Sequence, residues 1–311
     1  LSSDDMIHDN IIHEVHTSCS SWDSRSSAGE GNLQASTELS VESQTPRIAK
    51  QQRVNVFVRI KPSLEDEESR LCVAVGNNTR APSQETLVLE KQSRHGDDRC
   101  SKEYVFDGVL GQEASQSEVY QAVAQPVVDD VVHGYNGTIL AYGQTGAGKT
   151  HTLSSIKPEC IGIIPRAAQD IFQKISPDFD EVRLSYLQIY CEQIQDLLKP
   201  EMGDNLSIRE GKQGYVHVPQ LSEMVVTCLD DCLRLIQLGD RNRNVAFTEL
   251  NAHSSRSHAV VIFTVAKKRL DPSGKERTTI GKLFLVDLAG SERLKKSKSV
   301  AQRAVEARAI N

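Results

Sequence analysis

Residues 143–150 read Gly143-Gln144-Thr145-Gly146-Ala147-Gly148-Lys149-Thr150, which is a complete G-x-x-x-x-G-K-S/T phosphate loop. The apolar run Thr138–Tyr142 precedes this loop and predicts a buried strand, and a helix can begin directly after it. Glycines allow the backbone to approach an anion closely, so that successive N–H groups and a helix N-terminus point at phosphate oxygens. Lys149 brings a positive charge to the outer phosphates, and the Thr150 hydroxyl is suited to ligate Mg²⁺. We therefore interpret the stretch as a nucleotide site rather than as a glycine-rich turn.

A second motif supplies a further anchor for Mg²⁺ and a sensor for the γ-phosphate. Leu283–Asp287 is an apolar strand that ends in an acid, the form of a Walker-B element that holds Mg²⁺ through water. The sequence Asp-Leu-Ala-Gly then places Gly290 where its N–H can meet a γ-phosphate and reorient when that phosphate leaves. Such tetrapeptides are common in loops, but its place after an apolar strand favours the sensor interpretation.

A third motif, Asn251–His258, is a dense polar cluster in front of another apolar strand. Alone it would indicate a serine-rich loop with capping hydroxyls. Beside the other two motifs it offers hydroxyls for Mg²⁺ and phosphate oxygens, together with an arginine. The chain contains no Asn-Lys-x-Asp tetrapeptide of the kind that reads guanine, so a small GTPase is disfavoured.

Apolar periodicity predicts an α/β chain in which strands and helices alternate around the phosphate loop. Predicted helices are Ser115–His133 (kinked at Pro126), Pro165–Ile175, Glu192–Leu198 and Leu229–Gly239. Predicted strands are Val54–Ile60, Thr86–Leu89, Tyr104–Phe106, Val182–Tyr190, Ala259–Ala266 and Ile280–Val286, with the last two expected to pair antiparallel.

Composition narrows the class of protein. The chain has 311 residues, 38% hydrophobic and 25% charged, enough for one large or two ordinary domains. A net charge of −6 argues against a dedicated nucleic-acid binder, and no apolar run reaches membrane-spanning length. Seven scattered cysteines without a C-x-x-C pair favour reduced thiols in the cytosol. Residues 1–50 are polar and serine-rich and are predicted to form a disordered leader.

In this order and spacing the three motifs resemble those of a kinesin motor domain. The matching stretches are Tyr142–Thr152, Asn251–His258 and Asp287–Glu292, and similarity to the family's first strand at Val58–Pro62 adds support. The resemblance covers about residues 53–311. It implies a P-loop NTPase fold of the kinesin type, with a mixed central sheet flanked by helices on both faces. The family's later helices, last strand and neck linker have no counterpart in this sequence, so a motor domain that is partial at its C-terminus is expected.

Carried over residue by residue, the resemblance implies ATP and Mg²⁺ as cofactors. The metal ligands would be Thr150 and Ser255, with Asp287 behind them through water. Arg59 and Pro62 would border the adenine, with His151 close to the base. The nucleotide-binding residues of the loop are Gly143, Gln144, Thr145, Gly146, Ala147, Gly148, Lys149 and Thr150.

The resemblance also implies a set of catalytic residues. Gly290 would sense the γ-phosphate, and Arg256 and Glu292 would form a salt bridge that closes the site around the attacking water. Ser255 is a plausible first proton acceptor or relay. Such a site suits phosphoryl transfer, in which positioning and charge stabilisation matter more than a strong base.

Two departures from the family pattern stand out. The usual R-x-R-P is here Arg59-Ile60-Lys61-Pro62, and a lysine keeps the charge but loses the planar guanidinium, which predicts a slightly weaker adenine contact. The segment 294–301 lacks the usual glycine and carries three lysines, which suit either the acidic surface of tubulin or a solvated basic loop.

The resemblance implies an ATP-dependent microtubule motor, a microtubule-stimulated ATPase located in the cytoplasm on the cytoskeleton. The alternative is a nucleotide-dependent microtubule-binding module without motility. The expected partner is the microtubule, with no nucleic acid and no membrane span. The oligomeric state is open, a homodimer through a coiled coil outside this sequence being one option.

Overall fold

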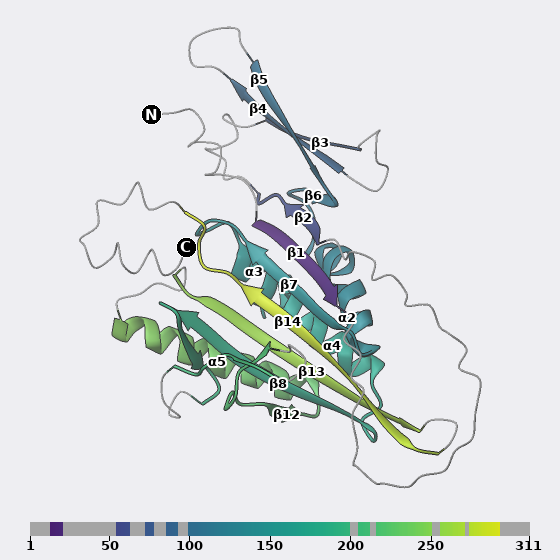
Figure 1. Ribbon diagram of the computed structural model, residues 1–311. Helices are drawn as coiled ribbons and strands as arrows, with labels where there is room; N and C mark the ends of the chain where they lie inside the picture. The colour runs from purple at the N-terminus through teal and green to yellow at the C-terminus, as the bar shows by residue number, and fades with distance from the viewer. Residues whose placement is uncertain are drawn as a thin grey trace, which may run out of the picture.

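A computed structural model of the chain describes residues 13–20, 54–62, 72–77, 85–92, 99–199, 205–211, 216–250, 256–270 and 274–292. Within these residues a nine-stranded mixed sheet forms the body of the molecule, and helices pack against it (Figure 1). The mixed α/β architecture predicted from the sequence is confirmed. None of the helices in these ranges is long and apolar enough to cross a membrane.

The central sheet brings the phosphate loop and the Walker-B acid to one edge. Its strand order is β12-β8-β13-β14-β7-β1-β2-β6, with β9 paired to β8. Strands β14 and β7 are parallel, with Asp287 in register with Ala141, so their carboxyl ends meet where the loop begins. The strands are β1 (His13–Ser20), β2 (Asn55–Arg59), β6 (Gly108–Leu110), β7 (Asn136–Tyr142), β8 (Asp180–Tyr190), β9 (Gln193–Asp196), β12 (Met224–Val226), β13 (His258–Leu270) and β14 (Glu276–Asp287).

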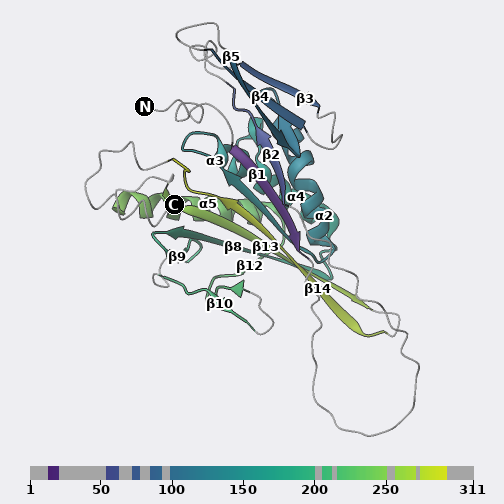
Figure 2. The same cartoon turned by 45° about the horizontal axis from the view of Figure 1, so that its top comes forward.

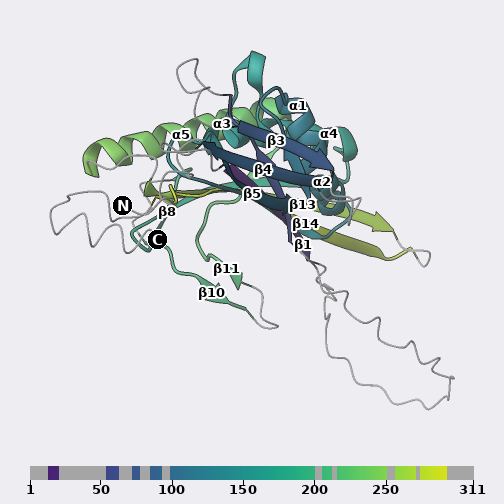
Figure 3. The ribbon, with the colours of Figure 1, turned by 90° about the horizontal axis from the view of Figure 1, so that it is seen from above.

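The described helices lie over one face of this sheet, as the view from above shows (Figure 3). The resemblance implies helices on both faces; in the part of the chain that the structure describes, the opposite face of β8 and β13 packs against Leu206, Val218 and Leu221, which flank a small hairpin. That hairpin pairs β10 (Arg209–Glu210) with β11 (Val216–His217). The helices are α1 (Gln116–Val119), α2 (Gln125–Val132), α3 (Lys149–Ser154), α4 (Ile163–Lys174) and α5 (Leu229–Leu250), with a π turn η2 (Tyr120–Ala124) and a 3₁₀ turn η3 (Pro158–Cys160).

The predicted helix 115–133 is present and changes type along its length. Ser115 and Glu118 form a reciprocal capping box that fixes its start. Pro126 lacks an N–H, and the turn before it is the π turn η2, so the chain changes helix type next to the proline. Its valines at steps of four are buried as predicted and pack onto the sheet core.

The predicted antiparallel pair of strands is confirmed and is longer than expected. Strands β13 and β14 pair continuously from Ala259 opposite Asp287 to Leu270 opposite Glu276. Near the far end, the Arg269 guanidinium donates to both carboxylate oxygens of Asp180, with N–O distances of 2.6 and 3.0 Å. Burial would raise the pKa of Asp180, but these bonds and the Ser176 N–H hold it below its usual value.

The leader prediction is wrong for residues 13–20. These residues form β1, which pairs antiparallel with β2 on one side and with β7 on the other. Average composition predicted disorder here because the segment contains one aliphatic residue, Val15, whereas backbone pairing does not depend on side-chain polarity. The remainder of the predicted leader, residues 1–12 and 21–50, lies outside the described residues.

The predicted helix Glu192–Leu198 is also wrong. Cys191 and Glu192 both adopt positive φ values, 48° and 63°, and turn the chain back on itself, so that residues 193–196 pair with β8 as strand β9. The Asp196 carboxylate then accepts the N–H groups of Leu198 and Ser222, each at 2.8 Å. These bonds tie the end of the hairpin to the segment before β12.

A second sheet of three strands packs over the β2–β6 end of the molecule (Figure 2). The predicted strands Thr86–Leu89 and Tyr104–Phe106 lie in it, and the third strand was not predicted. A cluster that includes Val58, Leu87 and Leu89 joins the two sheets. Its strands are β3 (Cys72–Asn77), β4 (Glu85–Gln92) and β5 (Arg99–Phe106).

Candidate nucleotide-binding site

The phosphate loop adopts backbone angles that its glycines make possible. Gly146 and Gly148 have φ values of 83° and 104°, a region that residues with a Cβ rarely adopt. Lys149 begins α3 and is 7% exposed. Its ammonium group donates to the carbonyl oxygens of Gly143 and Gln144 at 2.8 and 2.9 Å. Burial lowers the pKa of Lys149, and the nearby carboxylates of Asp287 and Glu292 oppose that shift.

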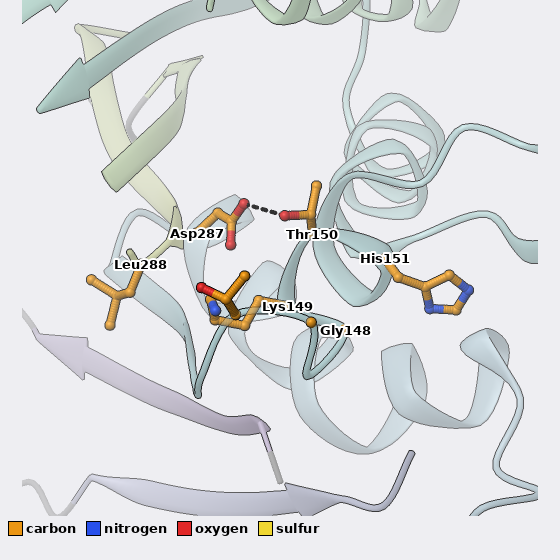
Figure 4. Close-up of a pocket in the computed structure, with 8 residues that line it drawn as sticks. Gly148, Lys149, Thr150, His151, Asp287 and Leu288 are labelled. Carbon is orange, nitrogen blue, oxygen red and sulfur yellow. Dashed lines mark hydrogen bonds between the residues drawn. The ribbon is translucent and has the colours of Figure 1, made fainter. Parts of the chain in front are cut away.

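The loop threonine and the Walker-B acid form a direct hydrogen bond. The Thr150 hydroxyl donates to Asp287 Oδ2 at 2.6 Å, across the edge where α3 starts and β14 ends (Figure 4). They line a cavity of about 210 Å³. The other residues lining it are Thr145, Gly146, Gly148, Lys149, His151 and Leu288.

Arg243 is a site residue that the sequence analysis missed. It lies on α5, is 6% exposed, and places one guanidinium nitrogen 3.5 Å from Asp287 Oδ2. The other terminal nitrogen donates to the carbonyl oxygen of Ser257 at 3.2 Å. The arginine thereby links the Walker-B acid to the end of the 251–258 motif. The sequence offered no signal for this role, and the predicted helix ended at Gly239, before Arg243.

The donor set fits a magnesium ion. Asp287 Oδ1 is buried and has no hydrogen-bond donor in the part of the chain that the structure describes. It therefore presents an unsatisfied carboxylate oxygen beside the Thr150 hydroxyl, which is a costly arrangement without a cation. Magnesium is commonly bound by one or two protein oxygens plus substrate phosphates rather than by a protein cage. Ser255, the other predicted ligand, lies outside the described residues.

The segment after β14 is fastened to the phosphate loop. Leu288 N–H donates to the Ala141 carbonyl oxygen, and Ser291 N–H donates to that of Gly143, each at 3.2 Å. At Gly290 an added Cβ would lie 2.2 Å from a Glu292 carboxylate oxygen and 2.5 Å from Thr145 Oγ1. A larger residue here would force the Glu292 and Thr145 side chains to move.

Glu292 contacts the phosphate loop, and its expected salt bridge with Arg256 stays a prediction. Its carboxylate accepts from the Thr145 N–H at 3.0 Å and from the Thr145 hydroxyl at 2.5 Å. Burial would raise the pKa of Glu292, but the two Thr145 donors and the Lys149 charge hold it below its usual value. An ionised carboxylate therefore occupies a loop N–H that could otherwise face a phosphate.

The residues expected at the base form a second group near α3. The Arg59 guanidinium donates to the Thr152 hydroxyl at 2.8 Å, and burial lowers the pKa of Arg59. Burial, followed by the charges of Arg59 and Lys157, also lowers the pKa of His151, so a neutral imidazole is favoured. Pro62 lies exposed just beyond β2.

Lys61, the departure from the family pattern, contacts the loop directly. Its ammonium group donates to the Gly146 carbonyl oxygen at 3.2 Å. The end of β2 is therefore tied to the tip of the phosphate loop. This contact uses the charge of the lysine and does not need the planar guanidinium whose loss was noted in the sequence.

Comparison with known proteins identifies the family. A model of the kinesin motor domain matches residues 59–311. The kinesin-like protein KIN-UA of Arabidopsis thaliana is 39% identical over 284 residues, covering 83% of this chain and 30% of that protein. A kinesin heavy chain of Caenorhabditis elegans is 41% identical over 265 residues, again covering 83% of this chain and 30% of that protein.

Structural comparison agrees. A solved structure described as a fast kinesin superposes with a TM-score of 0.67 at 35% identity, covering 81% of this chain and 70% of that one. The present chain spans about 30% of the length of the curated relatives it matches. With a phosphate loop, a Walker-B strand and the following Asp-Leu-Ala-Gly-Ser-Glu segment gathered at one sheet edge, the chain belongs to the kinesin motor domain family.

Proposed function

We propose that this chain binds and hydrolyses Mg-ATP and that microtubules stimulate its turnover, as part of a motor that moves along them. The observation that supports this most directly is the Thr150–Asp287 contact beside the unsatisfied Asp287 Oδ1. A metal-binding acid that reaches the hydroxyl of a phosphate loop is the arrangement that P-loop NTPases use. A protein that moves along microtubules would act in the cytoplasm on the cytoskeleton.

Different residues would bind the triphosphate, hold the metal ion and orient the attacking water. Backbone N–H groups of the loop would bind the phosphates, and Lys149 would exchange the Gly143 and Gln144 carbonyl oxygens for phosphate oxygens. Thr150 and Asp287, with Ser255, would hold Mg²⁺, which supplies neutralising charge to the outer phosphates when bound. Arg256 and Glu292 would orient the attacking water, and Ser255 would take or relay its proton.

Coupling to the track would begin at the segment 288–292. Its backbone is bonded to Ala141 and Gly143, and its Glu292 contacts Thr145. A γ-phosphate that draws the Gly290 N–H would compete with these contacts, so its arrival and loss would shift the segment between two positions. The residues that follow carry the lysines of the 294–301 loop, which suit an acidic tubulin surface.

The alternative proposal is a nucleotide-dependent microtubule-binding module without motility. In the structure Lys149 is turned onto loop carbonyl oxygens and Glu292 occupies the Thr145 N–H. A chain held in this state would sense nucleotide without turning it over rapidly.

The test is steady-state ATP turnover by residues 1–311, with and without polymerised tubulin. Lys149→Ala should abolish turnover, whereas Lys199→Ala, which changes an exposed lysine, should not. Turnover that rises strongly with tubulin supports the ATPase. Nucleotide-dependent co-sedimentation with microtubules, without turnover, favours the binding module. A chain that binds neither ATP nor microtubules would overturn both proposals.

A further inference from the structure

We propose that Gln116 is a positioning residue of the nucleotide site, whose side-chain amide fixes Arg59 and the backbone around His151 and so determines how tightly the adenine end is held. The inference rests on the proposed nucleotide-binding function. Gln116 belongs to none of the three phosphate-site motifs.

The Gln116 amide joins three separate segments. Its oxygen accepts from Arg59 Nη1 at 2.7 Å. Its nitrogen donates to the carbonyl oxygen of His151 at 2.7 Å and to that of Cys160 at 3.2 Å. Since a guanidinium can only donate and a carbonyl can only accept, these partners fix which end of the amide is which. β2, α3 and η3 are thereby held to a single side chain.

Gln116 is itself held firmly enough to act as an anchor. It is the first residue of α1 and is 7% exposed. The preceding Ser115 accepts the Glu118 N–H at 3.2 Å and donates its own N–H to the Glu118 carboxylate at 2.7 Å. This capping box fixes the backbone from which the Gln116 side chain projects.

Arg59 depends on neutral acceptors for its position. Besides Gln116 it donates to the Thr152 hydroxyl at 2.8 Å and to the Ala114 carbonyl oxygen at 3.2 Å. Among the described residues no carboxylate forms an ion pair with it. A half-buried cation held this way is oriented by geometry, and the loss of one acceptor leaves its direction poorly determined.

The contacts of Gln116 lie on the base side of α3 and spare the phosphate side. The Thr150–Asp287 bond and the Lys149 bonds to the loop do not involve Gln116. Gln116 instead holds the His151 carbonyl and, through Arg59, the Thr152 hydroxyl. A defect at Gln116 should therefore weaken recognition of the base and leave recognition of the phosphates intact.

The experiment compares ADP with inorganic tripolyphosphate, which has phosphates and no base. Affinities are measured by displacement of a fluorescent ADP analogue from wild type, Gln116→Leu, Gln116→Glu and the control Gln121→Leu, an exposed glutamine of η2. Circular dichroism and thermal melting verify that each variant is folded.

Gln116→Leu removes all three bonds and should weaken ADP binding roughly tenfold, with tripolyphosphate affinity within about twofold of wild type. Gln116→Glu keeps the acceptor for Arg59 and loses both donated bonds, so its ADP affinity should fall between those of wild type and Gln116→Leu. Gln121→Leu should change the affinity for neither ADP nor tripolyphosphate. If Gln116→Leu does not fold, the comparison of Gln116→Glu with wild type tests the inference instead.

An equal loss of affinity for ADP and tripolyphosphate would show that Gln116 has a merely structural role, and an unchanged ADP affinity would show that it has no role. Either result overturns the inference while the proposed function stands. A wild-type chain that binds neither ADP nor tripolyphosphate would overturn the proposed function and this inference with it.

Discussion

Glu292→Ala should separate nucleotide binding from hydrolysis. In the structure the Glu292 carboxylate accepts both the N–H and the hydroxyl of Thr145. If a phosphate uses the same N–H, binding must first break this contact. The alanine variant has no contact to break, so it should bind nucleotide more tightly. It should also lose hydrolysis, because the carboxylate expected to help position the attacking water is gone.

The size of the effect follows from the geometry and the exposure. Hydrogen bonds to charged groups contribute about 1.5–3 kcal/mol each in buried settings. Glu292 is exposed at the surface, so solvent screening reduces the combined contribution of its two hydrogen bonds with Thr145 to about 1 kcal/mol. That free energy corresponds to a roughly fivefold tighter nucleotide affinity in Glu292→Ala. Glu292→Gln keeps one neutral acceptor and should show a smaller gain.

The assay pairs equilibrium displacement of a fluorescent ADP analogue with single-turnover phosphate release in the presence of polymerised tubulin. Glu276→Ala serves as the control, since Glu276 lies at the opposite end of β14 from Asp287. Weaker or unchanged nucleotide affinity in Glu292→Ala would refute the competition between carboxylate and phosphate. Normal turnover in that variant would refute the role of Glu292 in hydrolysis.

Three further outcomes follow from the described contacts. Chelation of Mg²⁺ should weaken ATP binding at least tenfold in the wild type and hardly at all in Asp287→Asn, measured by the same displacement assay; equal sensitivity of the two would contradict metal binding at Asp287. Gly281→Ala would place a Cβ 2.1 Å from the Val131 carbonyl oxygen and should cost about 2 kcal/mol of unfolding free energy, whereas an unchanged melting temperature would contradict that packing. Arg269→Met should lower the unfolding free energy at neutral pH, where the Asp180 carboxylate is ionised whether folded or unfolded. Because the folded pKa of Asp180 is lowered, the difference in unfolding free energy between wild type and variant should begin to shrink below about pH 3.9, the unfolded pKa, and be lost only below the lower folded pKa; a difference in urea unfolding that stays constant through this range would count against the pair.

The phosphate half of the site could be predicted because its chemistry is local in sequence. Eight consecutive residues define the loop, and the strand that ends at Asp287 has an unbroken apolar run. Parallel pairing of β7 with β14, which the sequence analysis did not predict, then brings Asp287 to Thr150. The position of Glu292 could not be predicted in the same way, since its partner depends on the conformation of the segment after β14.

The residues that support the site could not be found from spacing. Gln116 and Arg243 are polar side chains in helices whose periodicity is explained by apolar positions alone. Their roles depend on what α1 and α5 meet across the fold, namely Arg59 and Asp287. Likewise, no feature of the sequence predicts positive φ values at Cys191 and Glu192, because neither residue is a glycine or an asparagine.

Strand β1 shows why average composition was the wrong measure for the leader. In register, Val15, Thr17 and Cys19 pair with Ala141, Ile139 and Gly137 of β7, all buried positions. Alternate residues of β1 are Glu14, His16 and Ser18, so the less polar residues recur with the period of two that a strand requires. An average over fifty residues removes that alternation.

The position of β1 gives it a direct bearing on the site. β1 lies between β2, which carries Arg59, and β7, which runs into the phosphate loop. His13 is opposite Arg59 and Glu14 is opposite Tyr142, so its first residues lie at the edge where both neighbours deliver their site residues. In the described part of the chain, β2 and β7 therefore belong to one continuous sheet through the backbone bonds of β1. A mutation that prevents β1 from pairing should loosen Arg59 relative to Thr152, even though no β1 residue belongs to a nucleotide-binding motif.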